Sequence, residues 1–543
     1  LALAALGGMA ATAAFLILAL SGRAAPPDLA GLYQAAGAPA PPIARIIIGA
    51  DGLRGFFKPH NARAAADRIV SEAIFEPLVT MGRDGLPVNA LAEKVDISPD
   101  GLTYTVTLRQ DPLFHKGQTL DGGDVAASYQ AAAGRNSDLE IYLAGIVGCE
   151  DFVTGKTSAI AGIRVLDPQT VAFDFLAARS ENIWALGLGI QDKEDALDEV
   201  RFRDTEWLNG TGPYRYGGYD RERREITLLA HAAYHGGAPA EDEIRVRDVP
   251  LAQAAAEYRQ GNINLFSFGY DPDLLERLAG ADDIDIYGYN GLECSFLGLN
   301  CAGEVMTADL RKALYFALDR EGLAERAYQN RAAPIELPLP PDSWLAHLDG
   351  PARETGRGSG RADRLFAQAG YRRDREGRLM KDGQQLRLRI AVQAGGLARD
   401  ELPELEARLT ALGIDVEAAV YDSGEFREVV YQERAFDAYL QQWQTNIHVA
   451  GSSVFAAPTH LTAGAGWANE AALAAMAKIP AAGSLGEVET LYREIIAAYR
   501  ADPPQIPLVA RKRFLAAHPD IQGFSLSAFQ SPFWNLAALF IRA

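Results

Sequence analysis

Two histidines have a spacing that could hold a metal ion. His231 and His235 lie four residues apart, and on a helix this spacing would place both imidazoles on one face, as in many zinc sites. The residues that follow, Gly236, Gly237 and Pro239, are typical of a turn instead. The other histidines are scattered along the chain: His60, His115, His347, His448, His460 and His518. The sequence therefore predicts no metal pair, and no cofactor is expected.

The sequence also lacks the motifs that identify common hydrolases and nucleotide-binding proteins. It has no His-Glu-x-x-His motif, no Gly-x-Ser-x-Gly nucleophile turn and no complete phosphate-binding loop ending in Gly-Lys-Ser/Thr. Adjacent carboxylates such as Asp282 and Asp283 stand in polar surroundings, which is typical of solvated side chains. The sequence thus predicts a protein that is not an enzyme, and a peptide hydrolase is the least favoured function.

Aromatic side chains are the better candidates for ligand contacts. Several lie at or just beyond the ends of predicted strands, where ligands collect in α/β sheets. Trp443 differs from the others because glutamines, Thr445 and Asn446 surround it, which favours a half-exposed platform over a core residue. Ordinary core packing is the alternative for the rest. The set comprises Phe75, Phe266, Phe268, Tyr270, Tyr289, Phe296 and Trp443.

The elements that would position these residues form two α/β regions. A β-branched strand at 44–50 opens the first region, and a strand, helix, strand unit spans 242–269. From Thr307 onward, apolar residues at helical spacing begin a second region of alternating helices and strands. Its last helix, near 488–499, gives way to prolines and a returning strand. At 543 residues the chain is too long for one hydrophobic core, so several domains are expected.

The segment "NGTGPYRYGGYD" (209–220) predicts the entry to a strand hairpin. Gly210 and Gly212 flank Thr211, so the backbone there can take positive φ or pass close to another segment. Pro213 has no amide donor, which suits the first residue of a strand. A strand, turn, strand pattern follows through residue 229.

Composition limits the class of partner. Hydrophobic residues at 48% and charged residues at 23% are ordinary for a globular protein. The net charge of -19 repels phosphate backbones, and no basic stripe with interleaved aromatics is present, so nucleic-acid binding is not expected.

The chain has three cysteines, Cys149, Cys294 and Cys301, so at least one of them has no partner for a disulfide within the chain. If residues 294–301 formed one extended strand, the last two sulfur atoms would lie roughly 23 Å apart, at about 3.3 Å per residue, and could not bond. Small buried hydrophobic side chains are the favoured interpretation. Whether Cys294 or Cys301 forms a disulfide elsewhere stays open.

The first 22 residues are an uncharged run rich in alanine, leucine and glycine. Such a run is typical of a secretory signal peptide, and a linker at 23–42 would follow it. A retained membrane anchor is the alternative, because about 20 apolar residues span a bilayer. No cysteine near residue 21 could accept a lipid. In either case the rest of the chain is expected in the periplasm.

Four motifs in one order resemble the extracellular solute-binding proteins of family 5, the peptide- and nickel-binding components of ABC importers. "FHKGQTLDGGDVAASYQ" is similar to the family's Phe-His-x-Gly and following helix start, although 121–123 depart from it. "GTGPY", followed by "AHAAYHGGAPAEDEIRV", resembles its entry strand and turn. "LGLNCAGEVMTADLRKALYFALDRE" and "LFAQAGYRRDREGRL" are similar to its second-lobe helix and hairpin. The resemblance covers roughly residues 43 to 540.

The resemblance implies a two-lobed periplasmic-binding-protein-like α/β fold with an extra domain inserted in the first lobe. Lobe I would comprise 43–80, 205–300 and 500–543, the inserted domain 81–204, and lobe II 301–499. The implied protein is a monomer that captures a small molecule or peptide between its lobes, closes on it, and delivers it to an inner-membrane ABC permease. The alternative is a membrane-anchored interaction or sensory subunit that reuses the fold without transport.

The resemblance also names candidate ligand contacts. Glu76 and Leu78 in "FEPLV" match a family segment that lines the peptide site, with Pro77 in place of glycine. "WQTN" (443–446) lies where peptide binders carry Trp-x-x-Asp, whose aspartate holds the peptide ammonium. Asn446 stands at that position here, which predicts a pocket that holds free peptide N-termini poorly. The expected contacts are Glu76, Leu78, Phe268, Tyr270, Glu293, Trp443 and Asn446, with Glu76 or Glu293 as substitutes for the missing carboxylate.

Overall fold

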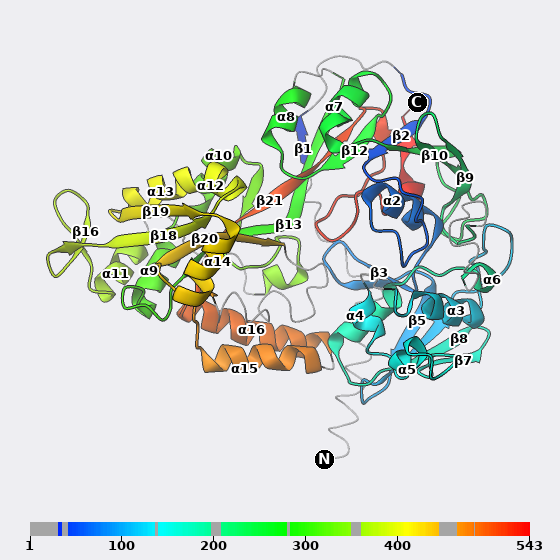
Figure 1. Cartoon of the computed structure of the whole chain (residues 1–543), viewed down its shortest axis with the longest axis horizontal. Helices are drawn as coiled ribbons and strands as arrows, with labels where there is room; N and C mark the ends of the chain where they lie inside the picture. The colour runs from blue at the N-terminus through cyan, green and yellow to red at the C-terminus, as the bar shows by residue number, and fades with distance from the viewer. Residues whose placement is uncertain are drawn as a thin grey trace. The chain divides into compact units, whose positions relative to one another are not determined.

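A computed structural model gives the structure of the chain, and its fold is mixed α/β, as the sequence predicts (Figure 1). None of the helices in the described ranges has the length and hydrophobicity that crossing a membrane requires. The structure describes residues 31–34, 42–135, 139–196, 208–279, 283–348, 360–444, 464–482 and 484–542.

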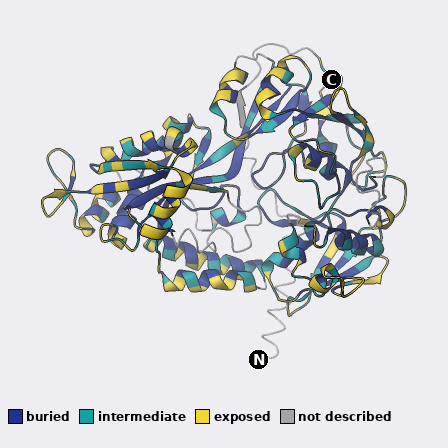
Figure 2. Cartoon of the chain, viewed as in Figure 1, coloured by how far each residue is buried: buried dark blue, intermediate teal, exposed yellow. Residues whose placement is uncertain are grey.

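The chain divides into two compact units. Unit 1 comprises Leu1–Tyr289, Ala481–Leu485 and Arg513–Ala543, and unit 2 comprises Asn290–Pro480 and Gly486–Lys512. Two long strands, β13 (Asp285–Leu299) and β21 (Gln505–Ala517), each contribute residues to both units. In Figure 2 the strands of each unit are mostly buried, whereas α15 and α16 carry many exposed residues. The predicted boundaries of the lobes and of the inserted domain stay predictions.

The main sheet of unit 1 is built around a parallel trio of strands. β2 (Ile46–Ala50) pairs in parallel with β11 (Glu243–Asp248) and with β12 (Leu265–Phe268). β9 (Tyr214–Asp220) and β10 (Glu225–Ala230) form the predicted hairpin on the β11 side. The predicted strand, helix, strand unit is also confirmed, with α7 (Leu251–Arg259) between β11 and β12. Branched apolar side chains on these strands build the core, including Ile46, Ile48, Ile226 and Val246.

A second, antiparallel sheet in unit 1 has its own core. Its order is β5 (Ala92–Ile97), β6 (Thr103–Leu108), β8 (Thr170–Asp174) and β7 (Ile163–Asp167). α3 (Gly122–Ala132) begins at the predicted N-cap, where the Asp121 side chain accepts backbone N–H bonds from Gly123 and Asp124. The buried core beside this antiparallel sheet includes Val106, Phe114, Tyr129, Phe173 and Trp184.

The sheet of unit 2 begins with three parallel strands. β18 (Arg387–Gln393) pairs in parallel with β19 (Asp415–Tyr421) and with β20 (Ala438–Gln444), and β20 then pairs antiparallel with β13. The amphipathic helix predicted after Thr307 is α9 (Ala308–Ala317), capped by the Thr307 hydroxyl. Two further helices matter below, α10 (Arg320–Tyr328) and α13 (Leu402–Ala411).

The three cysteines are free thiols, and Cys149 and Cys294 are buried. Cys294 and Cys301 do not share one extended strand, because β13 ends at Leu299 and Cys301 lies in the turn beyond it. Burial raises the pKa of the Cys301 thiol to about 12.

The remaining elements complete both units. In unit 1 they are β1 (Gly31–Gln34), α2 (Ala65–Ile74), β3 (Val79–Met81), β4 (Pro87–Asn89), α4 (Glu140–Leu143), α5 (Cys149–Val153), η1 (Ser180–Gly187), α6 (Lys193–Ala196), α8 (Pro272–Ala279), β22 (Ile521–Gln522), η8 (Leu536–Ala538) and β23 (Phe540–Ile541). From Ala332 to Ala501 they are β14 (Ala332–Pro334), η4 (Trp344–His347), α11 (Gly360–Gln368), β15 (Arg372–Arg373), β16 (Leu379–Lys381), β17 (Gln384–Gln385), α12 (Gly396–Asp400), α14 (Ser423–Arg427), η5 (Glu428–Glu433), α15 (Glu470–Lys478), η7 (Ile479–Ala481) and α16 (Leu485–Ala501).

Close backbone approach, not positive φ, explains the glycines before the hairpin. A Cβ at Gly210 would lie 1.9 Å from the carbonyl oxygen of Ile74, and one at Gly212 would lie 2.4 Å from that of Ala73. Neither glycine is among those with positive φ. The segment therefore runs directly against the end of α2, where only hydrogen fits.

We expect Gly210→Ala and Gly212→Ala to lower the free energy of unfolding, because the added methyl must displace backbone atoms that cannot rotate away. Overpacking of this kind costs about 1–3 kcal/mol. Gly269→Ala is the matched control, because a Cβ there meets nothing within 4 Å. Urea unfolding of the three variants measures the difference. Equal stability of all three would contradict the close approach.

Candidate functional site

Glu76 lies two residues beyond α2, and both of its carboxylate oxygens accept hydrogen bonds. The Tyr234 hydroxyl donates to Oε1 at 2.8 Å, and the Thr211 hydroxyl donates to Oε2 at 3.0 Å. His235 contributes its Nε2, which lies 2.9 Å from Oε2 and must carry the proton if the carboxylate is ionised. The side chains of Glu76 and His235 are only 12% and 8% exposed. The Glu76 carboxylate therefore links three hydrogen-bond donors that come from two loops.

A second junction lies beside it, at the carbonyl of Gly212. His115 Nε2 lies 3.0 Å from this oxygen and His231 Nδ1 lies 3.2 Å from it, with the two rings edge to face at 4.9 Å. A carbonyl only accepts, so both nitrogens carry hydrogens. The Gly210 N–H donates to the other nitrogen of His115, Nδ1, at 3.5 Å, which leaves that ring neutral.

The histidine pair considered in the sequence analysis has a separate hydrogen-bond partner for each ring. His231 bonds to Gly212 and His235 bonds to Glu76, so the two side chains serve different partners. Within the described ranges there is no cluster of three or more His, Cys, Asp or Glu side chains that could hold a metal ion. The turn predicted from the following glycines and proline is also what the structure shows at 232–237.

The other candidate residues of unit 1 are mostly buried. Leu78 is fully buried in the core beside the antiparallel sheet. Phe268 is 2% exposed and stacks on Phe266 and Phe514, with ring centroids 5.7 and 5.5 Å apart. Tyr270 is partly buried at the edge of the same cluster. Core packing therefore describes Phe268 well, and a ligand contact by these residues stays a prediction.

In unit 2, Glu293 on β13 belongs to a polar group that spans three strands. Gln442 Nε2 on β20 donates to Glu293 Oε1 at 3.1 Å. Arg511 on β21 contacts both the Glu293 carboxylate and the Gln442 amide oxygen, each at 2.5 Å. The Glu293 side chain is 43% exposed, whereas that of Arg511 is 13% exposed. Arg511 therefore neutralises a carboxylate that remains open to solvent.

Trp443 lies on the opposite face of the same strands. Trp443 on β20 pairs with Cys294 on β13. Gln442 and Glu293 are the preceding residues of these two strands, and successive side chains along a strand point to opposite faces. The Trp443 ring lies 4.7 Å from that of Phe296, and it packs against a cluster formed by Cys294, Ile335 and Ala510. The indole is half-buried, as predicted. The structure thus separates Trp443 from Glu293.

Glu401 was not singled out by the sequence. Its fully buried carboxylate accepts from the Tyr328 hydroxyl at 2.7 Å and from the Ser295 hydroxyl at 2.9 Å. Burial raises the pKa of Glu401 to about 7. Ser295 lies on the Glu293 face of β13, so this carboxylate supports the polar side of the strands. Its sequence context, a polar helix start, gives no sign of burial. Asn446 lies outside the described residues.

Unfolding should depend on pH because of His115. Burial lowers the pKa of His115 to about 4 from an ordinary value of 6.5, so the unfolded chain takes up the proton first as pH falls. The contribution of His115 to stability is therefore complete above pH 6.5 and is lost as pH falls toward 4, by roughly 3 kcal/mol.

Urea unfolding between pH 7 and pH 4 measures this loss. His115→Gln should show a shallower pH dependence than the wild type, because the amide can still donate to Gly212 but does not titrate. A pH dependence remains in this variant, because burial also lowers the pKa of His60 and of His231 and raises that of Glu401. Identical slopes for both proteins would contradict the assignment to His115.

Comparison with known proteins places these features in a family. The sequence model of "bacterial extracellular solute-binding proteins, family 5 Middle" matches residues 87–460. The glutathione-binding protein GsiB of Salmonella paratyphi A is 23% identical over 484 residues, covering 86% of this chain and 89% of that protein. The oligopeptide-binding protein AppA of Bacillus subtilis is 24% identical over 362 residues, covering 65% of each.

Solved structures agree on the fold. The periplasmic murein tripeptide-binding protein MppA, in its unliganded open form, matches with a TM-score of 0.74 and 16% identity over 95% of this chain and 99% of that one. HbpA2 from Haemophilus parasuis matches with a TM-score of 0.70 and 19% identity over 92% and 100%. The family match favours a solute-binding role over the sensory alternative. The chain belongs to the bacterial extracellular solute-binding proteins of family 5.

Proposed function

We propose that this protein acts outside the cytoplasm as a monomer, where it captures one organic solute and delivers it to an ABC permease in the inner membrane. The family match over residues 87–460 carries the proposal. Capture and delivery of a solute need no chemistry from this chain, which agrees with the absence of catalytic motifs from its sequence. By their names, the relatives reported above bind glutathione, oligopeptides and a murein tripeptide, so the family alone does not identify the ligand.

Trp443 is the proposed ligand contact in unit 2. Phe296, Cys294, Ile335 and Ala510 form its apolar surroundings, and all four are uncharged. A half-buried indole in such surroundings presents an apolar face with a polar edge, which suits an apolar or sugar-like part of a ligand.

No carboxylate suggested by the sequence is well placed to hold an ammonium group beside Trp443. Glu293 lies on the other strand face and is neutralised by Arg511. Both oxygens of Glu76 already accept bonds from Thr211, Tyr234 and His235. With Asn446 in place of the family's aspartate, we propose that the ligand is recognised without a free peptide N-terminus.

Calorimetry with free and N-acetylated dipeptides tests this proposal. The wild type should bind the two forms alike, because a neutral amide at Asn446 gives no ionic hydrogen bond to an ammonium. Asn446→Asp should gain affinity for the free form only. A hydrogen bond to a charged group contributes about 1.5–3 kcal/mol, so the expected gain is roughly ten- to a hundredfold.

Trp443→Ala provides the second arm, because it should weaken binding of the transport ligand while leaving the Asn446→Asp preference for free N-termini in place. Native mass spectrometry of the purified protein supplies the natural ligand for that measurement. Tight wild-type binding of free dipeptides that acetylation abolishes would overturn the proposal and would assign the ammonium to another carboxylate.

A further inference from the structure

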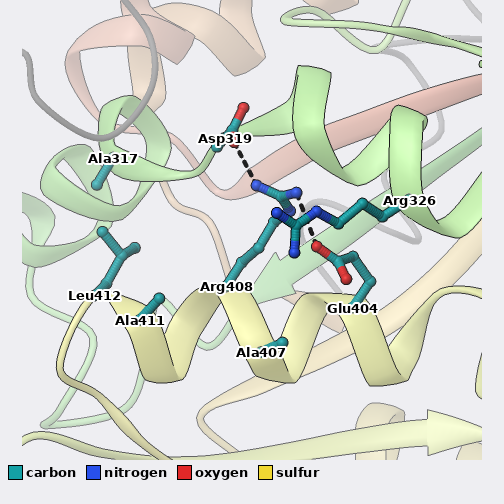
Figure 3. A pocket seen from close by; sticks show the side chains of 8 residues that line it. All are labelled: Ala317, Asp319, Arg326, Glu404, Ala407, Arg408, Ala411 and Leu412. Atoms are coloured by element: carbon teal, nitrogen blue, oxygen red, sulfur yellow. Dashed lines mark hydrogen bonds and ion pairs between the residues drawn. The ribbon is translucent and has the colours of Figure 1, made fainter.

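Unit 2 contains a pocket of about 300 Å³ that shares no residue with the candidate site described above. It lies between α10 and α13, near the C-terminal end of α9 (Figure 3). A volume near 300 Å³ is at the lower end of the range for small-molecule sites. The lining residues are Ala317, Asp319, Arg326, Glu404, Ala407, Arg408, Ala411 and Leu412.

One wall of the pocket is apolar. Ala407 and Ala411 lie four residues apart on α13, so their methyl groups share one helix face and leave space above it. Ala317 and Leu412 add further apolar surface, and both are buried. This wall can accept a small hydrophobic group.

The charged wall contains two arginines with different partners. Arg408 pairs with Asp319 and with Glu404, whose Oε1 lies 2.8 Å away. Its Nε is buried and has no acceptor among the described residues. Arg326, in the last turn of α10, is exposed and makes no ion pair or hydrogen bond with any residue that the structure describes. Figure 3 shows the two arginine side chains extending toward one another from their helices.

The balance of charge selects the ligand class. Two guanidinium groups face two carboxylates, so the pocket as a whole is neutral, with separated charges. A phosphate dianion would meet both carboxylates as well as the arginines, and like charges repel. A zwitterion has no net charge and separated ends that can match both signs.

We propose that this pocket binds a small zwitterion with an apolar side chain, such as a free α-amino acid. The ligand carboxylate bonds to Arg326 and faces Arg408, since guanidinium groups present paired donors that match carboxylate geometry. The ammonium contacts Glu404, whose side chain is 17% exposed and pairs with Arg408 through Oε1. The apolar side chain lies against Ala407, Ala411 and Leu412. This site is independent of the proposed transport ligand at Trp443.

Saturation-transfer difference NMR with L-leucine tests the proposal on the full chain. We expect a saturable signal with the wild type and none with L-leucinamide, which lacks the carboxylate. Arg326→Ala should weaken binding at least tenfold, as expected for loss of a charge-assisted hydrogen bond. Arg372→Ala is the matched control, because it removes another exposed arginine of unit 2 that does not line the pocket. Trp443→Ala should leave leucine binding unchanged.

Any one of four results would overturn the proposal. The first is no saturable leucine signal with the wild type. The second is a signal that survives Arg326→Ala but disappears in Trp443→Ala, which would place leucine at the candidate transport site. The third is an equal loss of leucine binding in Arg326→Ala and Arg372→Ala, which would show that binding depends on the net charge of the protein rather than on this pocket. The fourth is equal binding of leucine and leucinamide, which would count against a carboxylate contact.

Discussion

The carboxylate of Glu76 holds together the part of unit 1 on which the family motifs converge. Hydrogen bonds to a charged group contribute about 1.5–3 kcal/mol each, and removal of this acceptor would leave the buried donors of Tyr234 and His235 without a partner. Its neighbour, the Gly212 carbonyl, joins His115 and His231 in the same way. The motifs that resemble those of the family therefore build a structural junction in this chain.

Strand alternation imposes an equally strict constraint in unit 2. Successive side chains of β13 point to opposite faces, so Glu293 and Ser295 join the polar group of Arg511 and Glu401, while Cys294 packs near Trp443. A shift of one residue in the pairing would exchange the two environments. The uncharged surroundings of Trp443 are thus a consequence of register.

The sequence predicted what depends on near neighbours. The N-cap of α3 at Asp121, the hairpin after Pro213 and the half-buried state of Trp443 all follow from residues within a few positions. It could not predict the partners of Glu76, because Thr211 and His235 are 135 and 159 residues away in the chain. For the same reason it placed Glu293 and Trp443 in one set. The pairing of two strands far apart in the chain puts Trp443 opposite Cys294, on the other strand face from Glu293.

The two faces of β13 also differ in how charge is tolerated. On the polar face, Glu401 is fully buried, and its raised pKa of about 7 shows that burial opposes ionisation even with two hydroxyl donors. The positive charge of Arg511 acts in the other direction and favours the carboxylate. Moving such groups to the Trp443 face would place them among Phe296, Ile335 and Ala510, which offer no compensating charge. The separation of the faces therefore lets the same three strands hold a polar network on one side and an apolar cluster around Trp443 on the other.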